Sequence, residues 1–368
     1  MTTRLLLVGG FLGAGKTTLL WESARLLTSR GLRVGLITND QAPELVDTAF
    51  LSRCTVNVSE VSGSCFCCNF QGLLDAMSKL REEAQADVLI AEPVGSCTDL
   101  SATIIQPLKE ECLQRELVIA PLSVMADPVR LTDILDGGTA GLHPSAAYIF
   151  HKQLEEADII LISKTDLLTA TELEALKERA AQTFPAATIS TISTKSGEGI
   201  NTWLDDVTKR SDSGQHLAEV DYDVYAEGEA VLGWLNATVM LRGEPTEWNA
   251  FAEALLSGLS QRFDSMNASV GHVKLMISVG ESFLIGNLTG KGNTLSIRGS
   301  VPASCESRLT INARVQMSPE TLDTIVRETI ASTGKGCVAA TPVAWRCLRP
   351  GRPNPTHRYD HVVVTKEI

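Results

Sequence analysis

Three of the chain's nine cysteines fall within four positions, in the stretch SGSCFCCNF. Cys65 and Cys67 point the same way if this stretch is extended, and Cys65 and Cys68 do so if it turns. Either arrangement offers two or three thiolates to one ion, and thiolates select Zn²⁺ or another soft or borderline transition metal over Mg²⁺. Three ligands do not close a tetrahedral site. The motif therefore predicts an open, exchangeable metal site, or one completed by a carboxylate, a histidine or another subunit.

Two other interpretations of these cysteines stay open. They could be small apolar residues in a tight turn, or Cys65 and Cys68 could form a redox pair. The remaining cysteines are scattered, and we interpret residues such as Cys97 as small buried side chains. An odd, scattered set argues against a disulfide framework. The short apolar start reads as a buried strand rather than a signal peptide, so we expect a cytoplasmic, reducing compartment.

A glycine-rich loop near the start, GGFLGAGKTT, has the pattern G-x-x-x-x-G-K-T. Glycines let backbone N–H groups curl around a β-phosphate, and the N-terminus of the following helix favours anions. Lys16 is expected to reach the β- and γ-phosphates, and the Thr17 hydroxyl to hold Mg²⁺. The nucleotide-binding residues predicted in this loop are Gly10, Gly13, Ala14, Gly15, Lys16, Thr17 and Thr18.

Polar residues after a later strand indicate which base is bound. The tetrapeptide SKTD takes the place of the N-K-x-D motif of GTPases, with serine instead of asparagine. Its aspartate would accept hydrogen bonds from guanine N1–H and the 2-amino group, which adenine lacks at that edge. Downstream, ISTKSGEGI is similar to another GTPase segment, and the two together favour GTP over ATP. The base-binding residues predicted are Ser163, Lys164, Asp166, Thr194 and Lys195.

Glu92 ends the strand of DVLIAEPVG, and Gly95 follows three residues later. GTPases place an acidic residue toward Mg²⁺ or its water here, and a glycine N–H toward the γ-phosphate. The sequence contains no evident arginine finger. We therefore expect the hydrolysis of GTP to GDP and phosphate to be slow without a partner.

The elements that position these residues are Val/Ile/Leu-rich strands alternating with amphipathic helices. This pattern predicts an α/β fold of the P-loop NTPase type, a doubly wound, mainly parallel sheet whose ligands meet at the carboxyl ends of the strands. Residues 1–210 are the predicted P-loop GTPase domain and residues 211–229 a linker. Residues 230–368 are a smaller α+β domain, for which a ferredoxin-like arrangement is one interpretation.

The net charge of −12 argues against nucleic acid or an anionic membrane surface as a partner. The sequence has no apolar run of about 18 residues, so we expect no segment that spans a membrane.

The order of these motifs resembles that of the CobW family of P-loop GTPases, in the branch described as CobW-like metallochaperones. The resemblance rests on GGFLGAGKTT, ITND, GSCFCCNF, AEPVG, ADIILISKTDLL and SGEGI, all within residues 1–210. It implies a GTP-hydrolysing protein with GTP and Mg²⁺ at the P-loop and Zn²⁺ or Co²⁺ at Cys65, Cys67 and Cys68. The metal would be delivered to a client metalloprotein or a cobalamin-dependent protein, and a homodimer is one expected state.

The family commonly has Asn-Glu where this chain has Asn39 and Asp40, which implies a role for Asp40 toward Mg²⁺ or the transferred metal. The catalytic residues implied are Lys16, Thr17, Asp40, Glu92 and Gly95. One alternative function is a GTP-driven remodeller or activator of a corrinoid protein without metal transfer. A P-loop small-molecule kinase is less favoured, because no arginine-rich acceptor lid is found between the motifs.

Overall fold

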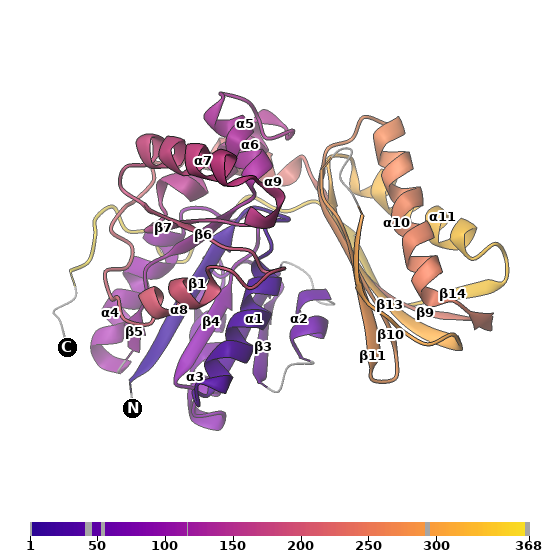
Figure 1. Cartoon of the computed structure of the whole chain (residues 1–368), viewed down its shortest axis with the longest axis horizontal. Coiled ribbons are helices and arrows are strands. Elements are labelled where there is room, and N and C mark those ends of the chain that lie inside the picture. The colour runs from indigo at the N-terminus through magenta and orange to yellow at the C-terminus, as the bar shows by residue number, and fades with distance from the viewer. Residues whose placement is uncertain (1, 41–45, 53–55, 116, 291–294, 365–368) are drawn as a thin grey trace.

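The computed structural model describes residues 2–40, 46–52, 56–115, 117–290 and 295–364, which form two separate sheets (Figure 1). The first sheet has the order β3-β2-β4-β1-β6-β7-β8, with β5 also pairing with β1. All of its pairings are parallel. Its strands are β1 (Thr3–Gly10), β2 (Val34–Asp40), β3 (Asn57–Ser62), β4 (Val88–Glu92), β5 (Leu117–Ile119), β6 (Ser123–Ala126), β7 (Ile159–Ile162) and β8 (Thr188–Thr191).

Helices cover both faces of this parallel sheet. They are α1 (Lys16–Ser29), α2 (Val46–Leu51), α3 (Phe70–Glu83), α4 (Gln106–Arg115), α5 (Pro128–Leu135), α6 (Pro144–Glu155), α7 (Ala170–Thr183) and α8 (Ile200–Val207), with a π-helical turn η1 (Ser101–Ile105) and a 3-10 turn η2 (Thr165–Leu167). Two apolar cores result, one on each face of the sheet. Strands buried on both faces need apolar side chains at nearly every position, which is why they read as continuous apolar runs. The predicted doubly wound α/β fold is confirmed.

The second sheet is antiparallel, with the order β12-β11-β10-β13-β9-β14. Its elements are β9 (Gly233–Thr246), α10 (Trp248–Ser265), β10 (Val270–Val279), β11 (Ser282–Leu288), β12 (Ser296–Gly299), β13 (Ser304–Val315), α11 (Pro319–Thr333) and β14 (Val338–Leu348). The two β-α-β units give the order β14-β9-β13-β10, which is the ferredoxin-like arrangement, and β11 and β12 extend one edge. The predicted α+β character of this part is confirmed.

Residues 211–229, expected to be a linker, pack against the parallel-sheet region. The Asp158 carboxylate accepts hydrogen bonds from the backbone N–H groups of Gly214 (2.6 Å) and Gln215 (2.9 Å). Helix α9 (Tyr222–Ala230) follows and lies against α6. We retain as a proposal that residues 1–210 and 230–368 are separate domains.

The antiparallel sheet presents one face to the parallel-sheet region, near α2, and carries α10 and α11 on the other (Figure 1). After β14 the chain returns to the parallel-sheet region, as the yellow trace shows. No helix in the described part of the chain combines the length and apolar composition that crossing a bilayer requires.

Candidate functional site

The predicted phosphate loop connects β1 to α1, and its glycines adopt backbone conformations that other residues avoid. Gly10, Gly13 and Gly15 have φ of 126°, 82° and 101°. A Cβ on Gly10 would lie 2.4 Å from the carbonyl oxygen of Met125. Ala14 is buried, and Thr18 lies half-buried in the first turn of α1. The loop thus has the tight turn and close backbone approach that a phosphate cradle requires.

The reactive groups of this loop lie against Glu92 and Gly95. The Lys16 ammonium donates to the Gly10 carbonyl (2.8 Å) and lies 3.8 Å from Glu92 Oε1. The Thr17 hydroxyl donates to Glu92 Oε2 (3.0 Å). A Cβ on Gly95 would lie 2.7 Å from Leu12 Cδ2 and 3.0 Å from Lys16 Nζ, so this backbone packs closely against the phosphate loop. Burial, and secondarily the charge of Asp47, raises the pKa of Glu92, while burial lowers the pKa of Lys16.

A cation from the antiparallel sheet also reaches this site. The Lys274 ammonium, from β10, donates to Asp47 Oδ1 (2.7 Å) and to the Thr17 hydroxyl (3.1 Å). Burial is the largest single influence on the pKa of Asp47 and raises it, but the charge and hydrogen bond of Lys274, the Thr17 hydroxyl and the charge of Lys16 together lower it, so the net direction is downward. An ammonium group among hydroxyl and carboxylate oxygens marks a position where a hard cation is favoured. The oxygen donors of Thr17, Asp47 and Glu92 therefore fit Mg²⁺ chemically.

The predicted base-binding residues gather beyond β7 and β8. The Ser163 hydroxyl donates to the Ala126 carbonyl (3.1 Å), and the Lys164 ammonium pairs with Asp127 (2.7 Å). The Asp166 carboxylate accepts from the Ser193 hydroxyl (2.6 Å), and Lys195 lies 3.6 Å from its other oxygen. Ser193 lowers the pKa of Asp166 through this hydrogen bond. Thr194 lies between Ser193 and Lys195, half-buried in the same loop.

The three clustered cysteines bring their sulfurs together. Cys65 Sγ lies 3.0 Å from Cys67 Sγ and 3.2 Å from Cys68 Sγ, and Cys67 Sγ lies 3.8 Å from Cys68 Sγ. The stretch turns, because the backbone N–H groups of Cys68 and Asn69 both donate to the Cys65 carbonyl. All three thiols are free, and together they form a group whose spacing could hold one metal ion. Cys65 and Cys67 are buried, while Cys68 is partly exposed.

A fourth thiol joins this cluster. Hydrogen bonds with Cys67, then with Cys68 and Cys97, lower the pKa of the Cys65 thiol well below the usual range. The same arrangement raises the pKa of Cys68 to about 11, chiefly through its hydrogen bond to Cys65. One thiolate stabilised by neighbouring thiols is a nucleus for binding a soft metal. Cys97 is buried, as predicted, but it also contacts the other three cysteines. Its place in the sequence, two residues after Gly95, is the one feature that indicated a position near the nucleotide site.

The amide of Asn39 ties the cysteine turn to the end of β2. Its Nδ2 donates to the carbonyls of Val61 and Ser64 (both 2.8 Å), and its Oδ1 accepts from the backbone N–H of Phe66 (2.8 Å). The neighbouring Asp40 instead pairs with Arg314 of β13, whose Nη2 lies 2.7 Å from Asp40 Oδ2. Both charged side chains of this pair are buried. The two residues predicted together from ITND therefore contact different parts of the molecule.

The C-terminal segment, residues 353–363, crosses over the cysteine turn. The backbone N–H of Asn354 donates to Cys68 Sγ (3.3 Å), and that of Thr356 donates to the Cys67 carbonyl (2.8 Å). Further along, Arg358 pairs with the buried Asp99 (2.7 Å). We call this segment the strap. It covers Cys68, the one cysteine of the three that is partly exposed.

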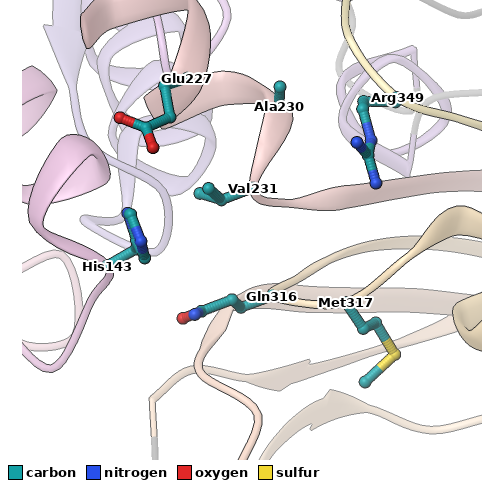
Figure 2. Close-up of a pocket in the computed structure, with 7 residues that line it drawn as sticks. All are labelled: His143, Glu227, Ala230, Val231, Gln316, Met317 and Arg349. Atoms are coloured by element: carbon teal, nitrogen blue, oxygen red, sulfur yellow. The ribbon is translucent and has the colours of Figure 1, made fainter.

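A pocket of 360 Å³ lies away from these residues, where α9 runs into β9. Figure 2 shows Glu227 and His143 on one side, Gln316 and Met317 on another, and Arg349 beyond them. No predicted site residue lines this pocket.

Sequence reasoning missed Asp47, Asp127, Lys274 and Arg314. The last two had a weak signal: GHVKLMI and TINARV alternate apolar and polar residues, which indicates strands with one polar face. The alternation does not show what the polar face of these strands contacts, which is the phosphate loop region and the end of β2.

A P-loop nucleotide fold with a thiol cluster beside its phosphate loop is the class that this geometry defines. Residues 4–191 match the family model described as CobW/HypB/UreG, nucleotide-binding domain. The match covers slightly more than half of the chain, and the chain belongs to this family. The resemblance identified from the motifs is thereby confirmed.

Curated relatives agree with this assignment. The zinc chaperone CobW of Sinorhizobium sp. is 29% identical over 192 residues, 46% of this chain and 53% of the relative. The zinc chaperone YjiA of Escherichia coli (strain K12) is 29% identical over 192 residues, 50% of this chain and 56% of the relative. The chain spans about half the length of the curated relatives it matches.

Among solved structures, this chain is similar to HypB from Helicobacter pylori in complex with nickel. The two are 17% identical with a TM-score of 0.43, and the superposition covers 60% of this chain and 91% of HypB.

Proposed function

We propose that this protein is a GTP-hydrolysing metallochaperone that holds Zn²⁺ on its cysteine cluster and passes it to a client metalloprotein. One observation carries the proposal. The loop after β4 touches both sites, because Gly95 lies against Lys16 and Cys97 is hydrogen-bonded with Cys65 and Cys67. A displacement of this loop at the phosphate site would therefore move a sulfur in the metal cluster.

At the nucleotide site, we assign the phosphates to the loop N–H groups and Lys16, and the guanine edge to Asp166. The Thr17 hydroxyl and the Glu92 carboxylate are the groups we assign to Mg²⁺, which would supply charge neutralisation for the phosphates. Gly95 would offer its N–H to the terminal phosphate. The buried ion pair of Asp40 with Arg314 supports a role for Asp40 in joining the two sheets at this site rather than in holding metal.

At the metal site, Cys65, Cys67 and Cys68 are the assigned ligands, and the cargo ion is Zn²⁺, with Co²⁺ as another borderline ion the thiolates would accept. The relatives described as zinc chaperones support Zn²⁺. Cys97 adds a fourth sulfur next to Cys65. A cluster that is buried apart from Cys68 would release its ion only when the loop or the strap moves.

The test is a measurement of Zn²⁺ affinity, by competition with a chromophoric chelator under reducing conditions, for protein loaded with Mg²⁺ and either GDP or a non-hydrolysable GTP analogue. We expect Zn²⁺ affinities that differ by about tenfold or more between the two states. Cys67→Ser should abolish stoichiometric Zn²⁺ binding, because it removes one of the three assigned ligands and leaves only two of them beside Cys97. Lys16→Ala should remove hydrolysis and the nucleotide effect while leaving Zn²⁺ binding in the absence of nucleotide.

Cys305→Ser is the matched control, because Cys305 is an exposed thiol on β13. It should bind Zn²⁺ as the unmodified protein does. Unchanged Zn²⁺ affinity in Cys67→Ser would reject the metal site, and equal affinity in the two nucleotide states would reject the coupling.

A further inference from the structure

Strand β10 of the antiparallel sheet begins directly against the phosphate loop. The Arg130 guanidinium donates to the carbonyls of Leu12, Val270 and Gly271 (all 3.2 Å), and so joins the loop to the start of β10. A Cβ on Gly271 would lie 2.9 Å from Leu12 Cδ1, and a Cβ on Gly13 would lie 2.8 Å from Thr289 Cγ2. The antiparallel sheet therefore forms one wall of the phosphate site.

The wall is polar because the strands alternate. Val273, Leu275 and Ile277 of β10 lie in the core under α10 and α11, so His272 and Lys274 face the other way. On β13, Ile311 and Ala313 likewise enter that core, while Asn312 and Arg314 face the parallel-sheet region. We call His272, Lys274, Asn312 and Arg314 the polar face.

Three residues of the polar face contact segments near the phosphates. Asn312 Oδ1 accepts from the backbone N–H of Val46, at the start of α2. Arg314 pairs with Asp40 at the end of β2, and Lys274 bridges Asp47 and Thr17. His272 is buried, and its Nδ1 has no hydrogen-bond partner among the described residues. The antiparallel sheet thus brings cations and an unsatisfied polar atom to the site.

Lys274 cannot keep its present contacts once Mg²⁺ and a triphosphate enter. Its ammonium lies on the hydroxyl of Thr17, the group assigned to Mg²⁺. Two cations on one hydroxyl repel each other, so the ammonium must leave Thr17. Asp47, Glu92 and the incoming phosphates are the anions near its flexible side chain. Glu92 is itself assigned to Mg²⁺, and a terminal phosphate attracts an ammonium group strongly.

We propose that Lys274 binds the terminal phosphate of a nucleoside triphosphate, so that the antiparallel region of the same chain senses whether that phosphate is present. The proposal rests on the proposed GTPase function. Lys274 would supply, from within the chain, a second cation beside Lys16, comparable to an arginine finger provided in cis. Loss of the phosphate would return the ammonium to Asp47, and loss of Mg²⁺ as well would return it to Thr17, where it lies in this structure.

The test uses the full chain and isothermal titration calorimetry with Mg²⁺ and either a non-hydrolysable GTP analogue or GDP. In Lys274→Gln we expect the affinity for the triphosphate to fall by about tenfold or more, the effect of one charge-assisted hydrogen bond, and the affinity for GDP by less than about threefold. Lys274→Arg should recover most of the triphosphate affinity, because it restores the cation. Arg242→Gln, which breaks an exposed ion pair with Glu306 on the same sheet, is the control and should bind both nucleotides normally.

Lys274→Gln leaves the Asp47 carboxylate without its ammonium, and the variant could misfold for that reason. Lys274→Gln combined with Asp47→Asn removes both charges and, compared with Asp47→Asn alone, should show the same selective loss of triphosphate affinity. Equal losses for GDP and the triphosphate, or no loss, in this double variant would overturn the role of Lys274. If the unmodified protein bound neither nucleotide, the proposed GTPase function itself would be lost, and the two failures are thus distinguishable.

Discussion

At the scale of single residues, the proposed metal site depends on the pKa values of buried groups that lie near one another, among them Cys65 and Glu229. Hydrogen bonds with neighbouring thiols lower the pKa of the Cys65 thiol well below the usual range, whereas burial alone would raise it. The charge of Cys65 also acts on the buried carboxyl group of Glu229 in α9. Its Oε1 accepts from the Ser96 hydroxyl (2.6 Å), and its Oε2 has no partner among the described residues. Burial, and next the charge of Cys65, raises the pKa of Glu229 to about 8.

This raised pKa predicts a pH-dependent stability. The folded protein keeps a proton on Glu229 up to about pH 8, whereas the unfolded chain releases it near its ordinary pKa. The contribution to stability is therefore full at low pH and is lost as pH rises through 8, by up to about 1.4 kcal/mol per pH unit. Glu229→Gln should raise the free energy of unfolding relative to the unmodified protein more at pH 8.5 than at pH 5, as measured by urea unfolding. Glu253→Gln, at an exposed position of α10, should show no such difference.

At the scale of elements, the end of β2 determines the shape of the cysteine turn. Three hydrogen bonds from one amide, that of Asn39, hold the turn before α3 begins at Phe70. Asn69 then caps α3 by accepting from the backbone N–H of Gly72. The sulfurs are thus placed by a strand end and a helix start, which are rigid elements.

Asn39→Ala should weaken Zn²⁺ binding by about 10- to 100-fold, because groups that orient metal ligands typically contribute that much. Chelator competition on the purified variant measures the change. Asn201→Ala is a suitable control, since Asn201 accepts a hydrogen bond from Arg30 at the surface of α8. If Asn39→Ala bound Zn²⁺ as tightly as the control, the amide would have no role in shaping the site.

At the scale of the whole molecule, segments distant in sequence enclose both sites. The antiparallel sheet covers the phosphate loop, and the strap, which follows β14, covers the cysteine turn (Figure 1). The strap is held through Thr356 at the cysteines and through Arg358 at the buried Asp99. Access to the proposed metal site therefore depends on a segment that lies far from the cysteines in the sequence.

Thr356→Pro should expose the cysteine turn, because proline has no N–H to donate to the Cys67 carbonyl. Losing a hydrogen bond of about 1 kcal/mol corresponds to roughly fivefold more frequent opening. Alkylation of Cys68 by iodoacetamide, followed by mass spectrometry of the modified peptide, should accelerate by about that factor. Thr356→Ser keeps the N–H group and should react at the original rate; equal rates in the two variants would show that the strap does not limit access.

Local patterns in the sequence were enough for the parallel sheet, the phosphate loop and the cysteine trio. Each depends on neighbours in the chain: glycines that permit positive φ, apolar runs buried on both faces, and three sulfurs that one turn brings together. Only the tertiary structure placed Cys97 at the three-cysteine group, Lys274 at Thr17, Arg314 at the end of β2, and the strap over Cys68. These partners lie from about 30 to almost 290 residues apart. Alternation along a strand shows that a face is polar, but the packing of the two regions decides what that face meets.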